Sequence, residues 1–331
     1  MAIIIQKFGG TSVADEASRE QVIKRIMQER DAGNNPVVVV SAMGRRGAPY
    51  ATDTLLDMVP GAAADLCALI VSCGEIISAC IVANSLNVKG IPAKALTCYT
   101  AGIMASGPYD GAVPTEIKTE NLEALVKSGT VPVVTGFQGV LPDFSIATLG
   151  RGGSDTTAVA LGAWLKAEYV DIFTDVPGVA MADPRIVPQA PFIPYLDYNS
   201  MVRLSAYGSK VLQDVSARIA MEKNVRVRIR STFDNSPGTV IGPARQDETN
   251  DLDKNDLDHM DLAGIAVKEK EKDLSLVTLV YKTGKGAGKA ERIAGQLEVT
   301  PSPSNDSDAV VFNLPKAQVK EALLTILAPY I

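Results

Sequence analysis

Short apolar runs alternate with longer segments of helical pattern in the first half of the chain. Ile3–Phe8 is rich in β-branched residues, and residues 37–40 are all valine, so each run predicts a buried strand. Residues 14–31, between them, predict a helix. Further strands are expected at Val131–Thr135 and residues 169–173, and helices at residues 74–87 and 158–167. Apolar strands separated by helices are typical of a mostly parallel sheet covered by helices on both faces, so an α/β fold is predicted.

The last third of the chain has a different pattern. Residues 244–259 are rich in charged and amide side chains and poor in apolar ones, which is typical of a linker. Beyond them, strands are predicted at residues 262–268, 275–281 and 310–313, and helices at residues 287–297 and 317–327. This pattern predicts a small ferredoxin-like α+β module. We therefore expect a domain at residues 1–243, a linker at residues 244–259 and a second domain at residues 260–331.

Residues 224–230 alternate polar and apolar side chains, as a half-exposed strand does. Its three arginines, Arg226, Arg228 and Arg230, have two interpretations: a phosphate-binding patch, or the solvated face of an outer strand. The second is the more ordinary arrangement and is favoured.

Composition narrows the function classes. The chain has 331 residues, of which 46% are hydrophobic, and this is enough for two globular domains. The net charge is −6 with no run of like charges, so nothing indicates binding to nucleic acid. Too few apolar residues precede Lys7 for a signal peptide, which needs roughly 7–15, and no run is expected to reach the ~20 apolar residues of a membrane span. A cytoplasmic protein without membrane contact is expected.

The cysteines and the histidine exclude several kinds of catalytic site. Cys67, Cys73, Cys80 and Cys98 lack the paired spacing of a zinc site, and His259 is the only histidine. A single imidazole within the predicted linker also argues against Ser-His-Asp and Cys-His catalysis. Chemistry must therefore rest on lysine, arginine, carboxylates and hydroxyls, with or without a metal ion.

Residues 148–157 (TLGRGGSDTT) are the most informative stretch. Three glycines and Arg151 lead into a helix that carries Ser154 and Asp155 in its first turn. The N–H groups and the dipole at a helix start favour anions, and a guanidinium suits a carboxylate or a phosphate. The alternative is an ordinary glycine turn in which Ser154 or Asp155 caps the helix.

The ends of the predicted strands carry glycine beside polar or charged residues. Lys7 is followed by Gly9 and Gly10, residues 37–40 by Ser41, and residues 169–173 by Thr174 and Asp175. Residues 136–139 (GFQG) follow a further strand. Because ligands of open α/β sheets bind beyond the carboxyl ends of the strands, we expect the site there.

Lys7 is the leading candidate for catalysis. A lysine tethered to a strand end is a positioned point charge, which suits the oxygens of a phosphoryl group in transfer. Asp155 and Asp175 are candidates to orient Lys7 and to bind Mg²⁺ through oxygen or water. The alternatives are a solvated strand-end lysine and two structural caps. Phosphoryl transfer needs positioning and charge neutralisation rather than an imidazole, so the scarcity of histidine is compatible with it.

Six segments, taken in order, match one known family. They are residues 7–13 (KFGGTSV), 39–44 (VVSAMG), 72–75 (SCGE), 136–139 (GFQG), 148–157 (TLGRGGSDTT) and 173–184 (FTDVPGVAMADP). Over residues 2–242 the chain resembles aspartokinase, of the amino-acid kinase superfamily. Residues 44–53 are similar to the Gram-positive, diaminopimelate-pathway branch.

The resemblance implies a three-layer αβα sandwich with a mostly parallel central sheet, followed by a small ACT-like domain. It implies transfer of the γ-phosphoryl group of Mg-ATP to the side-chain carboxylate of L-aspartate, which gives 4-phospho-L-aspartate. That reaction is the first step of lysine, threonine, methionine and diaminopimelate biosynthesis.

The same resemblance implies roles for individual residues. Lys7 would stabilise the phosphoryl group, and Asp155 would orient the phosphate-binding lysines. Aspartate would be bound by Ser41, Thr52, Glu75, Phe137, Arg151, Gly153 and Ser154. The nucleotide would be bound by Lys7, Gly9, Gly10, Thr174, Asp175, Asp183, Arg185 and Lys210. No protein ligand for the metal is implied, because Mg²⁺ would be bound mainly through the nucleotide phosphates.

Departures from the family pattern leave alternatives open. Ala180 replaces a tyrosine near the adenine, and Ile76 follows Glu75 where arginine or threonine is common. A related kinase acting on another amino-acid carboxylate, or a catalytically silent amino-acid sensor, therefore remains possible.

The tail has room for one ACT-like module, and residues 282–286 (KTGKG) stand in place of the usual Asp-x-Pro-Gly loop. We expect a homodimer formed through this module, with weak or absent feedback by lysine or threonine.

Overall fold

The computed structural model describes residues 1–244, 261–271, 273–282, 289–297 and 299–331. Within them the chain forms two compact units. Unit 1 comprises Met1–Pro177 and Glu222–Pro237, and unit 2 comprises Gly178–Met221 and Gly238–Ile331. The predicted linker lies outside the described residues except at its first residue, so the predicted domain boundaries stay a prediction.

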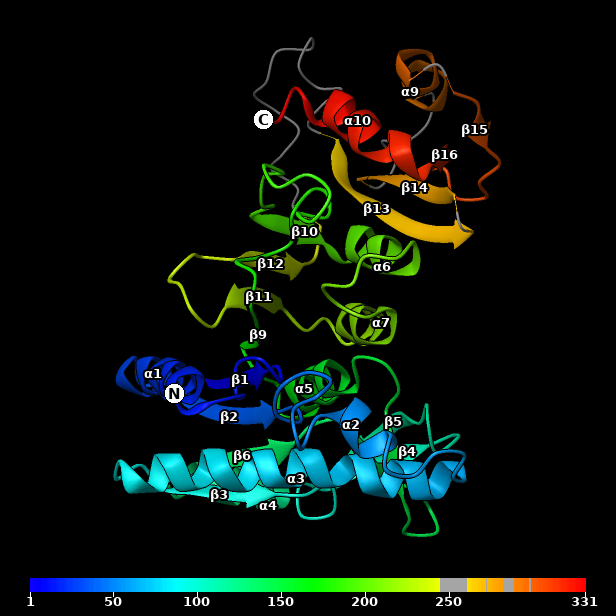
Figure 1. Cartoon of the computed structure of the whole chain (residues 1–331). Coiled ribbons are helices and arrows are strands. Elements are labelled where there is room, and N and C mark those ends of the chain that lie inside the picture. Colours follow the sequence, from blue (N-terminus) through cyan, green and yellow to red (C-terminus); the bar gives the residue numbers. More distant parts are fainter. Residues whose placement is uncertain (245–260, 272, 283–288, 298) are drawn as a thin grey trace. The chain divides into compact units, whose positions relative to one another are not determined.

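A parallel sheet forms the centre of unit 1, as the apolar runs predict. Its strands follow the order β11-β9-β1-β2-β6-β3 (Figure 1). Their bounds are β1 Ile3–Phe8, β2 Asn35–Val40, β3 Ala93–Leu96, β6 Val131–Thr135, β9 Tyr169–Thr174 and β11 Val227–Ser231. Because all these strands run in one direction, their carboxyl ends lie along the same edge.

Helices cover both faces of this sheet. Helix α1 (Glu16–Asp31) and helix α3 (Ala64–Val88) bury Ile26 and Leu86 against one face, together with Phe8. Helix α5 (Gly153–Trp164) covers the other face, and helix α4 (Glu120–Lys127) packs against β2 and β6. Because side chains alternate along a strand, Phe8 faces α1 and α3, whereas Lys7 faces α5. The predicted αβα sandwich is confirmed.

A second, mixed sheet in unit 1 brings two loops together. Its order is β5-β4-β7-β8, with β4 Ile103–Ser106, β5 Val113–Ile117, β7 Gln138–Val140 and β8 Ile146–Thr148. Strands β7 and β8 are antiparallel, and Gln138 lies opposite Thr148. The segment just before β7 and the segment just after β8 therefore lie side by side. These segments contain Phe137 and residues 149–152.

Helix α3 differs from the sequence prediction in two respects. It begins at Ala64 rather than near Gly74, so Gly74 lies inside a helix instead of opening one. It is also long and apolar enough to span a membrane, which the sequence analysis did not expect of any segment. Half of its most apolar stretch is buried inside the structure.

Unit 2 combines a short parallel pair with the C-terminal module. The pair is β10 (Tyr195–Asp197) with β12 (Thr239–Gly242), and it is accompanied by α6 (Tyr198–Ala206) and α7 (Asp214–Glu222). The module is an antiparallel sheet in the order β13-β14-β16-β15, with helices α9 and α10. Its bounds are β13 Leu262–Glu271, β14 Leu274–Tyr281, α9 Lys289–Leu297, β15 Pro301–Ser302, β16 Ala309–Pro315 and α10 Lys316–Leu327.

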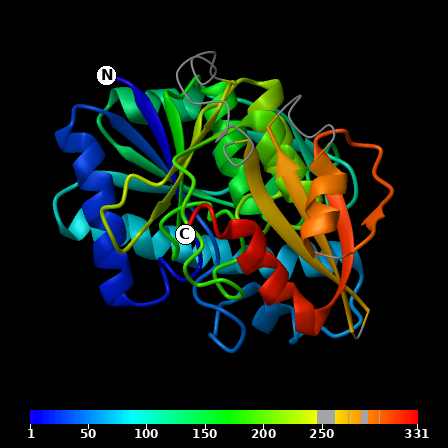
Figure 2. The same cartoon turned by 90° about the horizontal axis from the view of Figure 1, so that it is seen from above.

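The hydrophobic core of the module includes side chains that precede the module in the sequence. Helices α9 and α10 lie over one face of its sheet and α6 over the other (Figures 1 and 2). Phe312 and Leu323 belong to the same buried cluster as Met181, Val187 and Ala190, which come from the segment before β10. The predicted α+β module is therefore present, and its hydrophobic core extends into residues 180–193.

Candidate active site

Lys7 and Asp155 form an ion pair at the carboxyl edge of the parallel sheet. The Lys7 Nζ atom lies 2.7 Å from Asp155 Oδ1, and the two side chains are only 12% and 11% exposed. Side chains alternate along β1, and that of Lys7 lies on the face of the sheet that α5 covers. Asp155 lies in the first turn of α5. The positive end of the helix dipole favours a carboxylate there. The structure thus brings together the two residues predicted to be catalytic.

The glycine-rich loop carries Arg151 just before α5, and Ser154 precedes Asp155 in the first turn of that helix. Gly150 and Gly152 have φ angles of +70° and +67°, a conformation in which a side chain would be strained. Gly152 is the residue that precedes α5, and it caps the helix without a side chain, so the capping role considered for Ser154 and Asp155 is wrong. Ser154 is buried, whereas Arg151 is exposed and forms no ion pair within the described part of the chain.

Phe137 is packed against the start of α5. Its φ is +71°, unusual for a residue with a side chain, and its N–H donates to Thr157 Oγ1 at 3.0 Å. Its carbonyl accepts from Leu149 N at 2.8 Å. A Cβ on Gly153 would lie 2.6 Å from Phe137 Cδ2, so only glycine fits there. The structure therefore brings Phe137, Gly153 and Ser154 together.

Glu75 is a buried carboxyl on α3 with one unused oxygen. Its side chain is 2% exposed, and Oε1 accepts from Ala42 N at 3.0 Å. Oε2 has no hydrogen-bond partner among the described residues. Burial raises the pKa of Glu75 from its ordinary value to about 8, against the opposing effect of the Ala42 bond.

The loop after β2 lies against α3 next to Glu75. A Cβ on Gly74 would lie 2.6 Å from Tyr50 O and 2.9 Å from Ala42 Cβ, so glycine at that position permits the contact. Ser41 continues from β2, and its N–H donates to Phe8 O at 3.1 Å. Thr52 begins the short helix α2 (Thr52–Leu56). The loop that carries Ser41 and Thr52 thus borders Glu75.

Thr174 ends β9, which lies on the other side of β1, and Asp175 follows it. The Gly9 N–H donates to Phe173 O at 3.4 Å, which links the Gly9-Gly10 turn to the end of β9. Asp175 Oδ2 lies 2.6 Å from Arg45 Nη2 in an exposed ion pair. The structure therefore pairs Asp175 with Arg45, whereas the sequence analysis considered it as a partner of Lys7.

Asp183, Arg185 and Lys210 lie in unit 2. The Arg185 Nε atom donates to Asp183 Oδ1 at 2.9 Å. The Arg185 hydrogen bonds, and more weakly the charge of Lys210, hold the pKa of Asp183 below its ordinary value. Lys210 is exposed. These three predicted nucleotide residues form one charged group within their own unit.

Two residues of the site are not predicted from the sequence. Thr157 holds the Phe137 backbone, and Arg45 pairs with Asp175. Thr157 lies within residues 148–157, but its partner lies 20 residues away in another loop. For Arg45 no sequence signal existed, because a charged residue in a polar loop has many candidate partners.

The sequence model of the "Amino acid kinase family" matches residues 2–231. The chain therefore belongs to the amino acid kinase family. Within that family it is similar to the aspartokinases. It is 43% identical to Aspartokinase 1 of Bacillus subtilis over 245 residues, which cover 73% of the chain and 61% of that relative. It is 32% identical to the aspartokinase of Corynebacterium glutamicum, over 98% of the chain and 77% of that relative.

Solved structures of this family have the same fold. E. coli aspartokinase III in complex with aspartate and ADP matches with a TM-score of 0.78 at 20% identity, over 98% of the chain and 99% of that structure. Aspartate kinase from Synechocystis matches with a TM-score of 0.63 at 31% identity, over 99% of the chain and 56% of that structure. The resemblance to aspartokinase and the predicted fold are confirmed. The chain spans only about three fifths of the length of the Bacillus relative.

Proposed function

We propose that the chain is an ATP-dependent aspartate kinase. One carboxylate oxygen of the L-aspartate side chain attacks the γ-phosphorus of Mg-ATP, the bond from that phosphorus to the bridging oxygen breaks, and ADP leaves. The product is 4-phospho-L-aspartate. The observation that carries this proposal is the Lys7–Asp155 ion pair, a shielded cation with a fixed position at the sheet edge where open α/β folds bind ligands.

Lys7 acts as the electrostatic catalyst. Its ammonium neutralises charge on the non-bridging oxygens of the phosphoryl group, which needs no proton transfer. Asp155 holds the ammonium in place. Because Asp155 fixes the position of the ammonium, little reorganisation is needed during the reaction.

The ion pairs of Asp155 and Asp175 are compatible with a Mg²⁺ ion that is bound mainly by the nucleotide phosphates. Asp155 is paired with Lys7 and Asp175 with Arg45, so neither is a free ligand. When bound, Mg²⁺ neutralises charge on the phosphate oxygens. Gly9, Gly10, Thr174, Asp175, Asp183, Arg185 and Lys210 are the residues proposed to bind the nucleotide.

The aspartate site is proposed at the start of α5 and on α3. The exposed guanidinium of Arg151 suits a bidentate pair with a carboxylate of the substrate. The unused Oε2 of buried Glu75 suits the substrate ammonium, and that cation would lower the raised pKa of Glu75. Ser41, Thr52, Phe137, Gly153 and Ser154 are proposed to complete the site.

A hydroxylamine trap tests this proposal. Hydroxylamine converts an acyl phosphate to a hydroxamate, so the full chain is incubated with Mg-ATP and either aspartate or a panel of other amino acids. Hydroxamate from aspartate supports the proposal. Hydroxamate from a different acid only would indicate a related kinase, and none from any acid would indicate a silent sensor.

The assembly and context of the enzyme are further parts of the proposal. We infer a catalytic domain at residues 1–243, a linker at residues 244–259, and an ACT-like domain at residues 260–331 that pairs between subunits. We also infer a cytoplasmic enzyme at the first step of a lysine or diaminopimelate pathway. Light scattering of the full chain tests the dimer, and a monomer at micromolar concentration would contradict it.

A further inference from the structure

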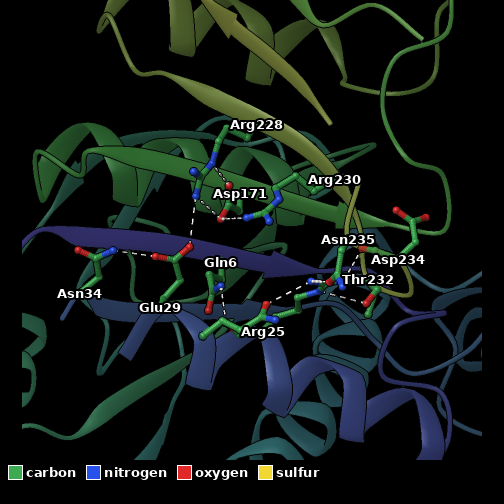
Figure 3. Close-up of polar contacts among 11 residues, drawn as sticks. Gln6, Arg25, Glu29, Asn34, Asp171, Arg228, Arg230, Thr232, Asp234 and Asn235 are labelled. Atoms are coloured by element: carbon green, nitrogen blue, oxygen red, sulfur yellow. Dashed lines mark hydrogen bonds and ion pairs between the residues drawn. The ribbon is translucent and has the colours of Figure 1, made fainter. Parts of the chain in front are cut away.

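Thr232, the residue directly after β11, is a hub of buried hydrogen bonds in unit 1. Its Oγ1 shares a hydrogen bond of 2.7 Å with Ser12 Oγ. Its N–H donates to Thr174 O at 2.9 Å, and its carbonyl accepts from Arg25 Nε at 3.2 Å. Thr232 and Ser12 have no exposed surface, and Arg25 is 5% exposed. Figure 3 shows Thr232 next to Arg25 of α1.

Two of the partners of Thr232, Ser12 and Thr174, belong to the two segments proposed to bind the nucleotide in unit 1. Ser12 closes the turn after Lys7, because its N–H donates to Gly9 O at 2.9 Å. Thr174 is the last residue of β9 and immediately precedes Asp175. Thr232 thus contacts the turn of Gly9 and Gly10 through its hydroxyl and the end of β9 through its backbone.

Arg25 fixes Thr232 and the rest of its loop. Besides Thr232 O, its guanidinium donates to Asn235 Oδ1 at 2.8 Å, to the carbonyl of Asp234, and to Gln28 Oε1 at 3.2 Å. Burial is the main reason that the pKa of Arg25 lies below its ordinary value. A buried guanidinium is tolerated only when its donors are satisfied, so the loop must keep the position in which these acceptors meet Arg25.

Aromatic packing also joins the carboxyl ends of β1 and β9. The Phe8 and Phe173 rings stack with centroids 4.8 Å apart, and the Arg25 guanidinium lies 5.9 Å from the Phe173 centroid. Phe8 follows Lys7, and Phe173 precedes Thr174. The buried side of this edge is therefore closely packed, while its other side carries Lys7.

We propose that Thr232 and Arg25 are positioning residues for nucleotide binding, which set the distance between the Gly9-Gly10 turn and Thr174. This inference rests on the proposed function. It assigns a role in Mg-ATP binding to residues on the buried side of the site, away from the substrate.

Thr232→Val tests the inference, because valine keeps the shape of threonine and removes the hydroxyl. Loss of one buried hydrogen bond should raise the KM for Mg-ATP about fivefold, with less than a twofold change in the KM for aspartate. Thr232→Ser should restore the Mg-ATP value. Ser12→Ala should have a similar effect, and the double variant should be no worse than the single ones, because both changes remove the same bond.

The matched control is Thr278→Val. Thr278 is also fully buried, on β14 in unit 2, but its hydroxyl has no hydrogen-bond partner among the described residues. This control should leave both KM values unchanged. If Thr232→Val also left the KM for Mg-ATP unchanged, or raised both KM values equally, the inference would be overturned.

Calorimetric binding of Mg-ADP separates this inference from the proposed function. If the wild-type chain binds Mg-ADP but makes no hydroxamate, the proposed kinase activity fails. A fivefold weaker Mg-ADP affinity of Thr232→Val would then still support the inference, and an unchanged affinity would overturn it. A wild-type chain that binds no nucleotide would overturn both.

Discussion

The alternation of side chains along β1 directs Lys7 toward α5, where the Asp155 carboxylate holds its ammonium. The role of Lys7 can therefore be tested without disturbing the core. Lys7→Ala should lower kcat by about 10²–10³, the usual effect of removing one preorganised electrostatic group. The fold should persist, since Asp155 keeps the favourable helix start. Hydroxamate formation and circular dichroism measure the two effects. The control is Lys94→Ala, an exposed lysine on β3, and near wild-type turnover in Lys7→Ala would contradict the assignment.

The raised pKa of Glu75 should make the free energy of unfolding depend on pH. Its pKa is about 8 in the folded chain and near its ordinary value when unfolded. Between these values the unfolded chain binds fewer protons, so stability should fall as pH rises toward 8, by at most about 1.4 kcal/mol per pH unit. Glu75→Gln cannot ionise and should lose this slope. Urea unfolding from pH 5 to pH 9 measures it, and equal slopes in both proteins would rule out the buried acid.

The sequence predicted the site residues better than their partners. Lys7 is visible because a cation at a strand end before two glycines is a local pattern. The residues alone left Asp155 and Asp175 as candidate partners of Lys7, and only the family resemblance favoured Asp155, which lies 148 residues from Lys7 in the sequence. The pairing of Asp175 with Arg45 was not predictable, because it depends on the path of a loop that has no periodicity.

At the level of elements, strand β11 shows the same limit. Its alternation is as predicted, but Arg228 and Arg230 are not the solvated face that the sequence analysis favoured. Their guanidiniums reach Asp171, which has no exposed surface, and Arg228 Nη2 donates to Asp171 Oδ2 at 2.7 Å (Figure 3). The alternation of polar and apolar residues predicts on which face of the sheet a side chain lies. It does not predict which charged residues lie on the neighbouring strand.

The start of α5 gives a prediction at the scale of one element. Gly153→Ala should improve helix propensity, yet its Cβ would lie 2.6 Å from Phe137 Cδ2. We expect a net destabilisation of about 1–3 kcal/mol and a higher KM for aspartate, because Phe137 must move. Urea unfolding and hydroxamate kinetics measure both effects.

Gly295 of α9 supplies the control for that substitution. A Cβ there meets no atom of the described residues within 4 Å, so Gly295→Ala should stabilise the chain by up to about 1 kcal/mol. If Gly153→Ala were as stabilising as Gly295→Ala, the contact between α5 and Phe137 would not constrain the site.

At the scale of the whole molecule, the apolar runs predicted strands of the parallel sheet of unit 1 and of the antiparallel sheet of unit 2. The compact units divide the chain at residue 178, inside the domain predicted at residues 1–243, and that domain boundary stays a prediction. From its sequence, segment 178–221 is predicted to continue the α/β domain, because its motifs match the amino acid kinase family. In the structure it belongs with the C-terminal module, since Met181, Val187 and Ala190 bury their side chains in the same cluster as Phe312 and Leu323. Sequence motifs show to which family a segment belongs, whereas compact units show which side chains are buried together. The boundaries of the two need not coincide.

The shared core predicts the effect of truncation after residue 243. Without the module, Met181, Val187 and Ala190 lose the side chains that cover them, so apolar surface is exposed. The truncated chain should bind a hydrophobic dye and be cleaved by protease within residues 178–221, whereas unit 1, which buries Phe8, Ile26 and Phe173 in its own core, should resist cleavage. A truncated chain with the thermal stability and protease resistance of the full chain would instead show that residues 1–243 fold independently.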